Sequence, residues 1–404
     1  MIISLSEVCE PKDKGSMGAQ YVAWSLENAG YTVNKEDYNP CDIELLSVHH
    51  VSDYERLKKI PKRGKIRIVG GHPCAVNPRP IIPFADVICV GEGETWVVDA
   101  LKRLEKSFDL DSLKDLSGTI ICKDWKKEND IPKPNIEKGV PDHPAYLNKA
   151  IEGHAQTWYL EIARGCPWAC HYCELGNTLK YRHRKTEQII EKLEGLDKKI
   201  TKKISFFAPD IASHPGYDEI LRTSQKMGFI TQFGSMRVEQ IMKKNIPLKG
   251  NMLVRVGMDG LSEETRFKVG RKQTDVDFIR YFRKMSEDGH TNFKIFMIVG
   301  YPWETEKDLD CWIKLMSKIS QIDRRTNAHV RIKITPFIPQ PTTPLKDSKA
   351  KYDMILIKRM EEWIKKWKPK RTPGWFFEQD GCVMSWKNWK KQCELTNGDE
   401  ESLI

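Results

Sequence analysis

Apolar and polar positions follow two kinds of pattern along residues 1–106. Met17–Ala29 and Thr95–Leu104 place apolar side chains on one face at helical spacing. Short apolar runs of strand character lie around them: Ile2–Leu5, Ile43–Val48, Ile66–Val69 and Val87–Val90. Strands that alternate with helices are typical of an open parallel sheet, so we predict a Rossmann-like α/β domain here.

Three of these strands run into loops at the edge where such sheets bind ligands. The loops are Cys9–Gly18, Gly70–Pro73 and Gly91–Glu94. Glycines in the last two let the backbone approach a large flat ligand without a side-chain collision. We therefore expect a ligand site at this edge.

The pattern loosens over residues 107–157. Thr119–Cys122 is predicted as an edge strand. Prolines then follow closely, at Pro132, Pro134, Pro141 and Pro144. We interpret this stretch as a proline-rich linker between two domains.

A second series of strands and helices begins at Trp158–Ile162. Further strand-like runs recur at Ile204–Phe207, Ile230–Phe233, Met252–Gly257, Phe293–Val299 and Val330–Ile334. Helical patterns separate these runs. Six strand–helix units predict a partial parallel (β/α)6 barrel over residues 158–345, with active residues on loops at the carboxyl ends of its strands.

The last stretch, residues 346–404, holds five of the twelve tryptophans in the chain. Tyr352–Trp367 predicts an amphipathic helix, and a non-helical segment starts at Pro373. We interpret the stretch as a small C-terminal cap in which tryptophans are buried. A sharper hypothesis is that Trp375–Gly381 reaches into a substrate cavity.

Composition places the chain among globular proteins. Of 404 residues, 40% are apolar and 30% charged, which does not match disordered chains. We find no apolar run that could span a bilayer and no secretory signal, so we expect a cytoplasmic protein. The eleven cysteines, an odd number, do not suggest a secreted disulfide framework. A net charge of +10 permits an RNA partner without demonstrating one, and we interpret it as lysine-rich solvated faces.

The densest chemistry lies in the loop after Trp158–Ile162. Cys166, Cys170 and Cys173 occur there at spacings of four and three residues. Three thiols cannot all pair among themselves, so they suit a compact metal centre better than a disulfide. On a cube of four irons, three thiolates leave one iron open to a substrate or cofactor. The alternatives are a zinc site with His171 or a distant cysteine as fourth ligand, or three unrelated buried cysteines.

Together with the aromatic Tyr172, this loop resembles the CxxxCx(aromatic)C signature of radical S-adenosylmethionine (SAM) enzymes. The resemblance implies a [4Fe-4S] cluster on Cys166, Cys170 and Cys173. In that family the amino and carboxylate groups of SAM chelate the open iron. One electron from a donor such as a flavodoxin or ferredoxin then cleaves SAM to a 5'-deoxyadenosyl radical. An oxygen-sensitive cluster would suit an anaerobe or a reducing cytosol.

Stretches further along the chain resemble the family's SAM-contacting segments. The resemblance implies SAM contacts at Tyr172, Asp210, Arg237, Asp259, Arg266, Gly300 and Pro302. Three positions depart from the family pattern: Asp259 stands in place of a glutamate, Gly260 in place of a serine, and Trp303 in place of a glycine in the GxPGET loop. Arg237, Arg266 and Arg271 are all candidates for the SAM carboxylate, because an arginine fork matches a carboxylate bidentately.

The N-terminal domain resembles the cobalamin-binding domain found in many radical SAM enzymes, where GG(P/H) and GEGE loops recur. The resemblance implies cobalamin contacts at Gly70, Gly71, His72, Gly91, Glu92 and Gly93. The chain has no Asp-x-His-x-x-Gly motif, so a base-off cobalamin without an evident histidine ligand is implied. His49 and His50 stay open as contacts. The alternative is a Rossmann-like domain without a cofactor.

The resemblance as a whole implies a cobalamin-dependent methyltransferase that adds a methyl group to an unactivated carbon, with SAM as both radical source and methyl donor. An alternative is a radical SAM methylthiotransferase acting on tRNA, with a second cluster on Cys9, Cys41 and Cys74. A further alternative is a non-enzymatic cluster or zinc module that binds nucleic acid.

Some properties stay open at this point. The substrate could be a peptide or protein side chain, a tRNA or a small metabolite, because pocket shape rather than motif sets the choice. We name no catalytic residue. We expect a monomer that does not associate with membranes.

Overall fold

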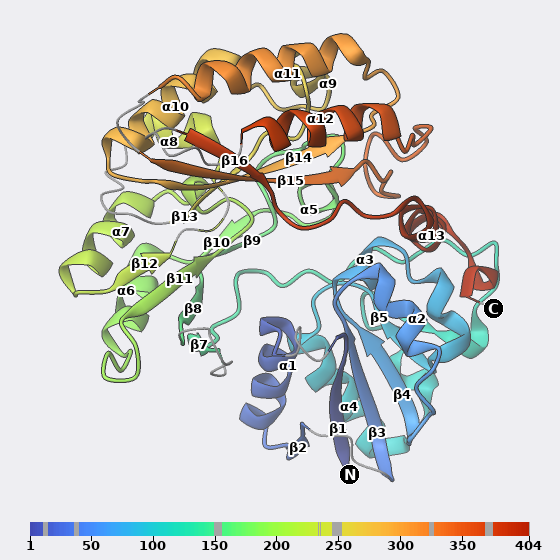
Figure 1. Ribbon diagram of the computed structural model, residues 1–404. Coiled ribbons are helices and arrows are strands. Elements are labelled where there is room, and N and C mark those ends of the chain that lie inside the picture. The colour runs from blue at the N-terminus through green and yellow to red at the C-terminus, as the bar shows by residue number, and fades with distance from the viewer. Residues whose placement is uncertain are drawn as a thin grey trace. The chain divides into compact units, whose positions relative to one another are not determined.

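The apolar runs of the N-terminal part form neighbouring strands of one sheet (Figure 1). The computed structural model describes residues 1–10, 15–35, 40–148, 156–232, 234, 236–244, 253–322, 327–367 and 375–403. The chain divides into an N-terminal unit (Met1–Lys149, Gln340–Thr342, Lys390–Ile404) and a barrel unit (Ala150–Pro339, Thr343–Trp389). The domain boundaries at residues 106, 157 and 345 stay predictions.

The N-terminal unit contains a six-stranded sheet. In sheet order its strands are β2 (Val33–Asn34), β1 (Ile3–Val8), β3 (Cys41–Val48), β4 (Gly64–Gly70), β5 (Val87–Cys89) and β6 (Thr119–Ile121). The first five are parallel, and β6 pairs antiparallel with β5. The four predicted strands and the predicted edge strand are therefore confirmed.

Helices cover both faces of this sheet. They are α1 (Met17–Asn28), α2 (Tyr54–Leu57), α3 (His72–Val76) and α4 (Glu94–Ser107), with 3-10 turns at Val51–Asp53, Arg79–Phe84, Leu110–Leu113 and Cys122–Asp124. In β3, Ile43 and Leu45 enter an apolar cluster with α1 and α4, whereas Leu46 and Val48 enter a second cluster that includes Tyr54 of α2. Because successive strand side chains point to opposite faces, a strand buried on both sides reads as a continuous apolar run.

The strand order fixes where this unit can bind a ligand. In the sheet, β2 lies on one side of β1, whereas β3, β4 and β5 follow one another on its other side. The direction in which strands are added therefore reverses after β2. This reversal makes the gap between β1 and β3 a topological switch point. Open α/β sheets with the order 2-1-3-4-5 bind ligands there, beyond the carboxyl ends of the strands.

The rest of the N-terminal unit comes from the residues before Lys149 and from the last residues of the chain. It holds β7 (Tyr146–Leu147) and the 3-10 turn Glu400–Leu403, and it takes in the C-terminal part of α13 (Trp386–Asn397). Leu395 and Leu403 pack into the second apolar cluster beside Tyr54 and Cys74.

Seven strands of the barrel unit, among the described residues, form two parallel sheets. One has the order β12 (Ile230–Gln232), β11 (Lys203–Phe207), β8 (Trp158–Glu161), and the other β13 (Leu253–Gly257), β14 (Asn292–Val299), β15 (Ala328–Pro336), β16 (Trp375–Gln379). A parallel bridge between Met236 and Val256 joins them. The six predicted strands are confirmed over the described residues, while Phe233 and Met252 lie outside them. β16, within the predicted cap, was not predicted as a strand, and it pairs parallel with β15.

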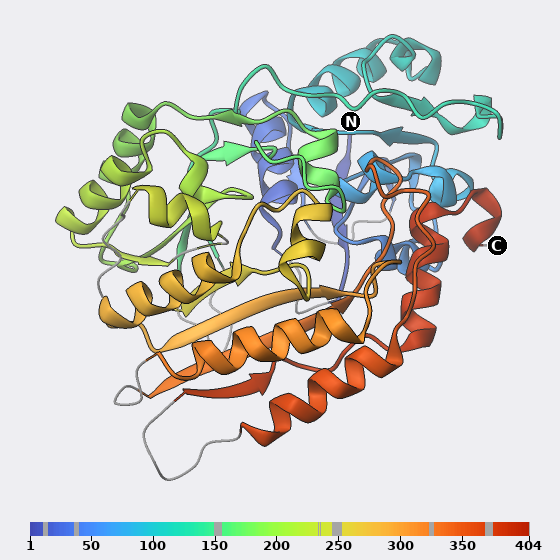
Figure 2. The same cartoon turned by 90° about the horizontal axis from the view of Figure 1, so that it is seen from above.

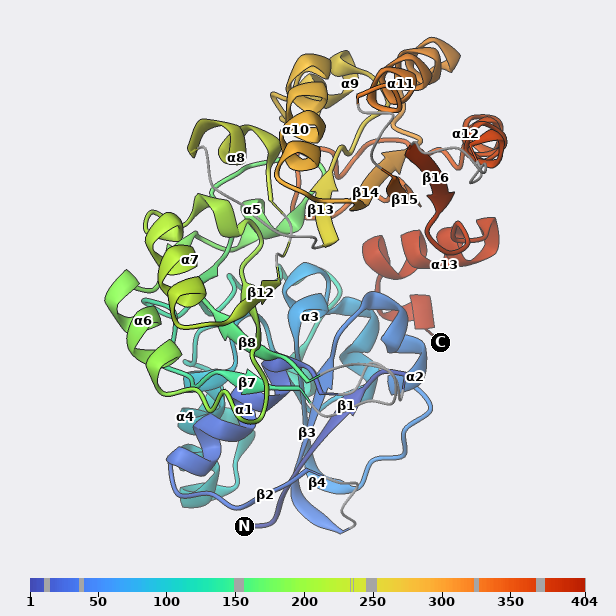
Figure 3. The same ribbon diagram turned by 60° about the vertical axis from the view of Figure 1, so that its left-hand side comes forward.

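Eight helices of this unit fall within the described ranges. They are α5 (Glu174–Thr178), α6 (Thr186–Glu194), α7 (Tyr217–Lys226), α8 (Val238–Lys244), α9 (Glu263–Lys268), α10 (Asp275–Glu287), α11 (Glu306–Ile319) and α12 (Met354–Lys366), with a 3-10 turn at Ile211–Ser213. Figure 2 shows α11 and α12 side by side along the β14–β16 strands, and Figure 3 shows these strands next to one another with α10 and α11 over one face. No helix among the described residues is long and apolar enough to cross a membrane.

The tryptophans of the C-terminal stretch are mostly packing residues. Trp363 of α12 packs edge-on against Trp312 of α11, and Trp375 of β16 stacks on Phe293 of β14. Trp363 and Trp375 are buried, whereas Trp386 is exposed. Pro373 lies outside the described residues. The role of Trp375–Gly381 in a substrate cavity stays a prediction.

Candidate metal-cluster site

The cysteine loop follows β8 and the short strand β9. β9 (Ala163–Arg164) pairs antiparallel with β10 (Arg182–His183), which closes the base of the loop. Between them Gly165 has φ +64°, and a Cβ there would lie 2.4 Å from the carbonyl oxygen of Lys180. Only glycine fits at this point. The cysteines therefore lie at the carboxyl end of the first barrel strand, as predicted.

Helix α5 holds the loop from within. The side-chain amide of Asn177 donates to the carbonyl oxygens of Cys170 (2.9 Å) and Cys173 (2.7 Å). A Cβ on Gly176 would lie 1.9 Å from the carbonyl oxygen of Trp168, so the helix backbone rests directly on the loop. Asn177 thus fixes the carbonyl groups of two of the three cysteines.

The three thiols fit a metal cluster better than a single ion. Cys170 is buried, and Cys166 and Cys173 are partly buried. Burial raises the pKa of the Cys166 thiol to about 11 and that of Cys173 to about 12, so metal binding must displace their protons. Each of these two thiols feels the charge of Cys170, yet the three sulfur atoms do not all lie within 4.8 Å of one another. A cube of four irons spreads its thiolates more widely than one tetrahedral zinc does.

His171 makes several contacts at the end of the cysteine loop. Its Nδ1 lies 2.8 Å from the carbonyl oxygen of Lys268, and its backbone N–H donates to Val269. Its own carbonyl oxygen accepts from the N–H of Leu345. His171 therefore ties the cysteine loop to the end of α9.

Asp210 and Arg237 lie together beside the loop. The indole N–H of Trp168 donates to Asp210 Oδ2 (2.7 Å), and the guanidinium of Arg237 lies 4.2 Å from the centre of the Trp168 ring. Arg237 Nη1 is also 3.5 Å from the sulfur of Cys170. A buried cation beside a thiolate stabilises the negative charge that a cluster brings. These two predicted residues are thus brought to the cysteines.

A chain of hydrogen bonds continues from Arg237. Its Nε pairs with Glu239 at 2.5 Å, and Gln273 joins Glu239 (2.6 Å) to Arg271 Nε (3.1 Å). Arg271 Nη1 then reaches the hydroxyl group of Tyr172 at 3.1 Å. The loop residues Cys170 and Tyr172 are in this way connected through side chains that follow the third and fourth strands.

Tyr172, Asp259 and Arg271 form a compact group. The hydroxyl group of Tyr172 donates to Asp259 Oδ2 (2.7 Å), and Arg271 Nη1 lies 2.8 Å from the same oxygen. Asp259 has φ +49°, a left-handed backbone that aspartate tolerates better than most residues. A Cβ on Gly257 would lie 2.6 Å from Asp259 Oδ2. The aspartate that replaces the family's glutamate therefore has a defined partner set in this chain.

Arg266 is placed differently from the other predicted arginines. It is fully buried, its Nε donates to the carbonyl oxygen of Gln273, and its guanidinium pairs with Asp275 and lies over the ring of Phe278. All these partners belong to the protein. Of the three candidates for the SAM carboxylate, Arg237 and Arg271 lie beside the cysteine loop.

The loop after β14 is shaped by Gly300 and Glu304. Gly300 has φ +99°, and a Cβ there would lie 2.2 Å from the carbonyl oxygen of Lys351. Glu304 Oε2 accepts from the N–H groups of Gly300 (2.7 Å) and Tyr301 (3.2 Å), and Oε1 from Leu261 (3.2 Å). Burial raises the pKa of Glu304 to about 7 despite these bonds. Pro302, the next predicted contact, is exposed.

The predicted cobalamin contacts lie at the carboxyl edge of the N-terminal sheet. A Cβ on Gly71 would meet the carbonyl oxygen of Val48 at 2.1 Å, and one on Gly91 that of Asn135 at 2.3 Å. These two glycines are therefore required by the chain's own backbone. A Cβ on Gly70 would lie 3.7 Å from the Cys89 side chain and one on Gly93 3.6 Å from Val22, which are ordinary van der Waals contacts, so the chain's own packing does not require glycine at these two positions.

The other two predicted cobalamin contacts have local roles. His72 is the first residue of α3, and Glu92 Oε2 accepts from the N–H of Glu137 (2.9 Å). Residues 135–137 of the predicted linker thus pack against the Gly91–Glu94 loop.

Sequence reasoning missed several residues that hold the site. Asn177, Glu239 and Gln273 have no motif of their own. Asn177 contacts carbonyl groups only four and seven residues away, whereas Gln273 reaches Glu239 across 34 residues. Glu304 lies within a stretch that was recognised, but its role as an acceptor for three backbone N–H groups was not foreseen.

Two protein-family models match the chain. The model described as "Radical SAM superfamily" matches residues 160–316, which include the cysteine loop. The model described as "Radical SAM proteins, N-terminal" matches residues 42–116.

Similar proteins were found by sequence and by structure. A Methanocaldococcus jannaschii protein, named "Uncharacterized protein MJ0966", is 26% identical, and the match covers 89% of this chain and 78% of that protein. The ribosomal protein uS12 methylthiotransferase RimO of Clostridium botulinum is 31% identical over 39% of each chain. The radical SAM methyltransferase TsrM of Kitasatospora setae, solved with cobalamin and a [4Fe-4S] cluster, has a TM-score of 0.61 at 13% identity, over 85% of this chain and 77% of that one.

The barrel unit is thus a partial α/β barrel that carries the cysteine loop at the carboxyl end of its first strand. The chain belongs to the radical SAM superfamily and is a radical SAM enzyme, whose cofactors are a [4Fe-4S] cluster and SAM. Cys166, Cys170 and Cys173 fit that cluster by donor type, by burial and by the neighbouring cation of Arg237.

We predict that Asn177→Ala weakens iron retention. The variant loses two hydrogen bonds worth about 2 kcal/mol together, which is roughly 30-fold in an equilibrium. After anaerobic reconstitution, iron per chain is measured against rising chelator concentration. The chelator concentration that removes half of the iron should be at least roughly tenfold lower for the variant than for the wild-type chain. Asn388→Ala, at an exposed position, is the matched control. Identical curves for Asn177→Ala and the wild-type chain would show that these bonds do not hold the loop.

We also predict a pH-dependent stability from Glu304. Its unfolded carboxyl group loses its proton near pH 4.5, whereas the folded one keeps it up to about pH 7. Wild-type stability relative to Glu304→Gln should therefore fall as pH rises from 4.5 to 7 and level off above, by up to about 3 kcal/mol. Denaturant unfolding of both chains at a series of pH values measures this difference.

Asp308→Asn is the control for that experiment. Burial acts to raise the pKa of Asp308, but hydrogen bonds from Ser262 and Thr305 outweigh it and lower the pKa below 3.8. The stability that ionised Asp308 contributes is lost only at pH values more acid than these. The difference in unfolding free energy between wild type and Asp308→Asn should therefore stay constant from pH 4.5 to 7. A constant difference for Glu304→Gln as well would contradict the assignment of the raised pKa.

Proposed function

We propose that this radical SAM enzyme is a cobalamin-dependent methyltransferase that adds a methyl group to an unactivated carbon. The observation that carries the proposal is the pairing, in one chain, of the cysteine-loop barrel with a Rossmann-like sheet of switch-point topology. The fold likeness to TsrM over 85% of the chain supports this pairing. Cobalamin would use the carboxyl edge of the N-terminal sheet, where Gly70 ends β4 and Gly93 follows β5.

The residues of the barrel unit would bind and orient the reactants. Cys166, Cys170 and Cys173 would hold the cluster, and Arg237 would balance its charge. Tyr172, Asp259 and Gly300 would line the SAM side, with Arg237 or Arg271 at its carboxylate. The bound cluster and SAM supply one-electron radical chemistry, and cobalamin supplies a methyl carrier. The protein's contribution is orientation, which can lower a barrier by several kcal/mol.

The methylthiotransferase is the second candidate, favoured by the RimO match. That reading needs a second cluster on Cys9, Cys41 and Cys74. In the strand register Ile3 pairs with Ile43 and Val8 with Val48, so Cys41 and Cys9 lie at opposite ends of neighbouring strands. At about 3.3 Å per residue they are roughly 25 Å apart, too far to share a cluster. Cys74 is buried in an apolar cluster. The described cysteines therefore do not support a second cluster.

Other properties belong to the proposal as well. Radical SAM enzymes require an electron donor and a substrate, and here a flavodoxin or ferredoxin would serve as the donor. The substrate class stays open among peptide or protein side chains, tRNA and small metabolites. We also propose that the protein is cytoplasmic and monomeric.

Metal and product analysis after anaerobic reconstitution with iron, sulfide and hydroxocobalamin tests the proposal. We expect about four irons and one cobalt per chain, and 5'-deoxyadenosine formed from SAM under reducing conditions. Cys170→Ala should abolish both the iron and the product, whereas Cys311→Ala, at an exposed cysteine, should change neither. About eight irons without cobalt would reject the methyltransferase and favour the methylthiotransferase.

A further inference from the structure

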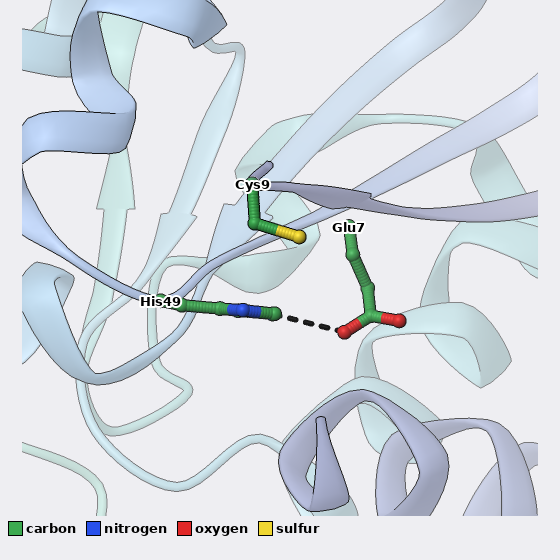
Figure 4. A group of neighbouring side chains, drawn as sticks. All are labelled: Glu7, Cys9 and His49. Carbon is green, nitrogen blue, oxygen red and sulfur yellow. Dashed lines mark ion pairs between the residues drawn. The ribbon is translucent and has the colours of Figure 1, made fainter. Parts of the chain in front are cut away.

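Three side chains of different chemistry meet where β1 and β3 end. Figure 4 shows Glu7 and Cys9 from the end of β1 and His49 from the end of β3, directed toward one another. One ligand atom from each lies within 4.8 Å of the other two. His49 Nε2 is 3.0 Å from Glu7 Oε2, and both side chains are 13% exposed. The group is thus enclosed but reachable from the solvent.

The backbone around the group holds two of its members in place. Glu7 Oε1 accepts from the N–H of Gly15 and Oε2 from that of Ser16, both at 2.8 Å. Ser16 is the N-cap of α1, so the carboxylate is fixed at the start of that helix. Asp53 accepts from the backbone N–H of His49 (3.3 Å) and so fixes the turn that carries the imidazole. Such outer contacts orient metal ligands in known sites.

The surroundings of Cys9 differ from those of other cysteines in this unit. Other cysteines of this unit pack among apolar side chains, such as Cys74 and Cys89 in the two core clusters. Cys9, in contrast, places its sulfur within 4.8 Å of a carboxylate oxygen and an imidazole nitrogen. Sulfur, nitrogen and oxygen donors together are typical of zinc and of similar divalent transition metals, and not of magnesium or calcium.

The position in the sheet is a second, independent argument. The group lies at the carboxyl ends of β1 and β3, which is the topological switch point of this unit. Ligands of open α/β sheets bind there for reasons of topology, whatever the side chains. A set of three metal-binding side chains at that point is therefore well placed to present a metal to a ligand.

We propose that Glu7, Cys9 and His49 form a binding site for a divalent transition metal of the zinc type. Three protein ligands leave one position of a tetrahedral site open, as in zinc sites that bind a water molecule or another ligand. On binding, the thiol of Cys9 forms its bond to the metal as a thiolate and releases its proton to the solvent. The proposal does not depend on methyl transfer or on the iron cluster.

The test measures metal binding in the full-length chain without cobalamin. The cluster cysteines would also bind zinc, so Cys166, Cys170 and Cys173 are replaced by alanine in all samples. After removal of metals, zinc is titrated and zinc per chain is measured. We expect about one tightly bound zinc, with an affinity lowered more than roughly 100-fold by Cys9→Ser, His49→Gln or Glu7→Gln.

Matched controls and a second signal make the result specific. His50→Gln changes the neighbouring exposed histidine, and Cys122→Ser changes a thiol elsewhere in the unit. Both should keep the zinc. Cobalt(II) in place of zinc should give a thiolate-to-metal absorption band that Cys9→Ser removes and Cys122→Ser does not.

Two outcomes would overturn the proposal. One is zinc binding that is equal in the parent chain and in the three site variants, and the other is no tight zinc in the parent chain. If the cysteine replacements disturb folding, as checked by circular dichroism, zinc is measured instead in the cluster-loaded chain with Cys166, Cys170 and Cys173 intact. The same comparison of site variants and controls then decides.

Discussion

The cysteine site of the barrel unit depends on two buried arginines that stay in contact with hydrogen-bond acceptors. Arg237 and Arg271 are each less than a tenth exposed, and a buried guanidinium without partners would be strongly unfavourable. Glu239, Gln273 and Asp259 supply those partners. Because the same hydrogen bonds end at Cys170 and at Tyr172, the charge balance of the arginines also fixes the cysteine loop. Breaking one link would leave a buried cation unpaired beside the cluster.

Most of the fold could be predicted because the sheets and helices of both units follow simple periodicities. Strands such as β3 and β14 are apolar runs of ordinary length, and α1 and α10 place apolar residues on one face. β16 escaped prediction because its aromatic run follows Pro373 and Gly374, which are typical of loops. Its strand character comes from pairing with β15, a tertiary contact that a local pattern does not report.

The site was predictable where a motif is local and less so where it is spatial. The three cysteines and Tyr172 lie in eight consecutive positions, so their spacing alone pointed to a cluster. Gln273 acts through a contact with Glu239, 34 residues away, that only the folded chain forms, and Asn177 acts on nearby carbonyl groups without any motif that marks it. Gly91 was predicted as a point of approach for a cofactor, and the structure gives it a second reason, since its φ of +112° and the backbone of Asn135 both demand glycine. The Glu7, Cys9 and His49 group has no sequence signature, because it forms only when β1 and β3 pair.

At the cysteine loop, three protein thiolates would hold a four-iron cluster with one iron left for SAM. Mössbauer spectra of the chain reconstituted with 57Fe, recorded with and without SAM, test this arrangement. We expect a [4Fe-4S] spectrum in which SAM shifts the signal of one iron in four and leaves the others unchanged. A spectrum that SAM does not alter, or one without a four-iron cluster, would contradict it.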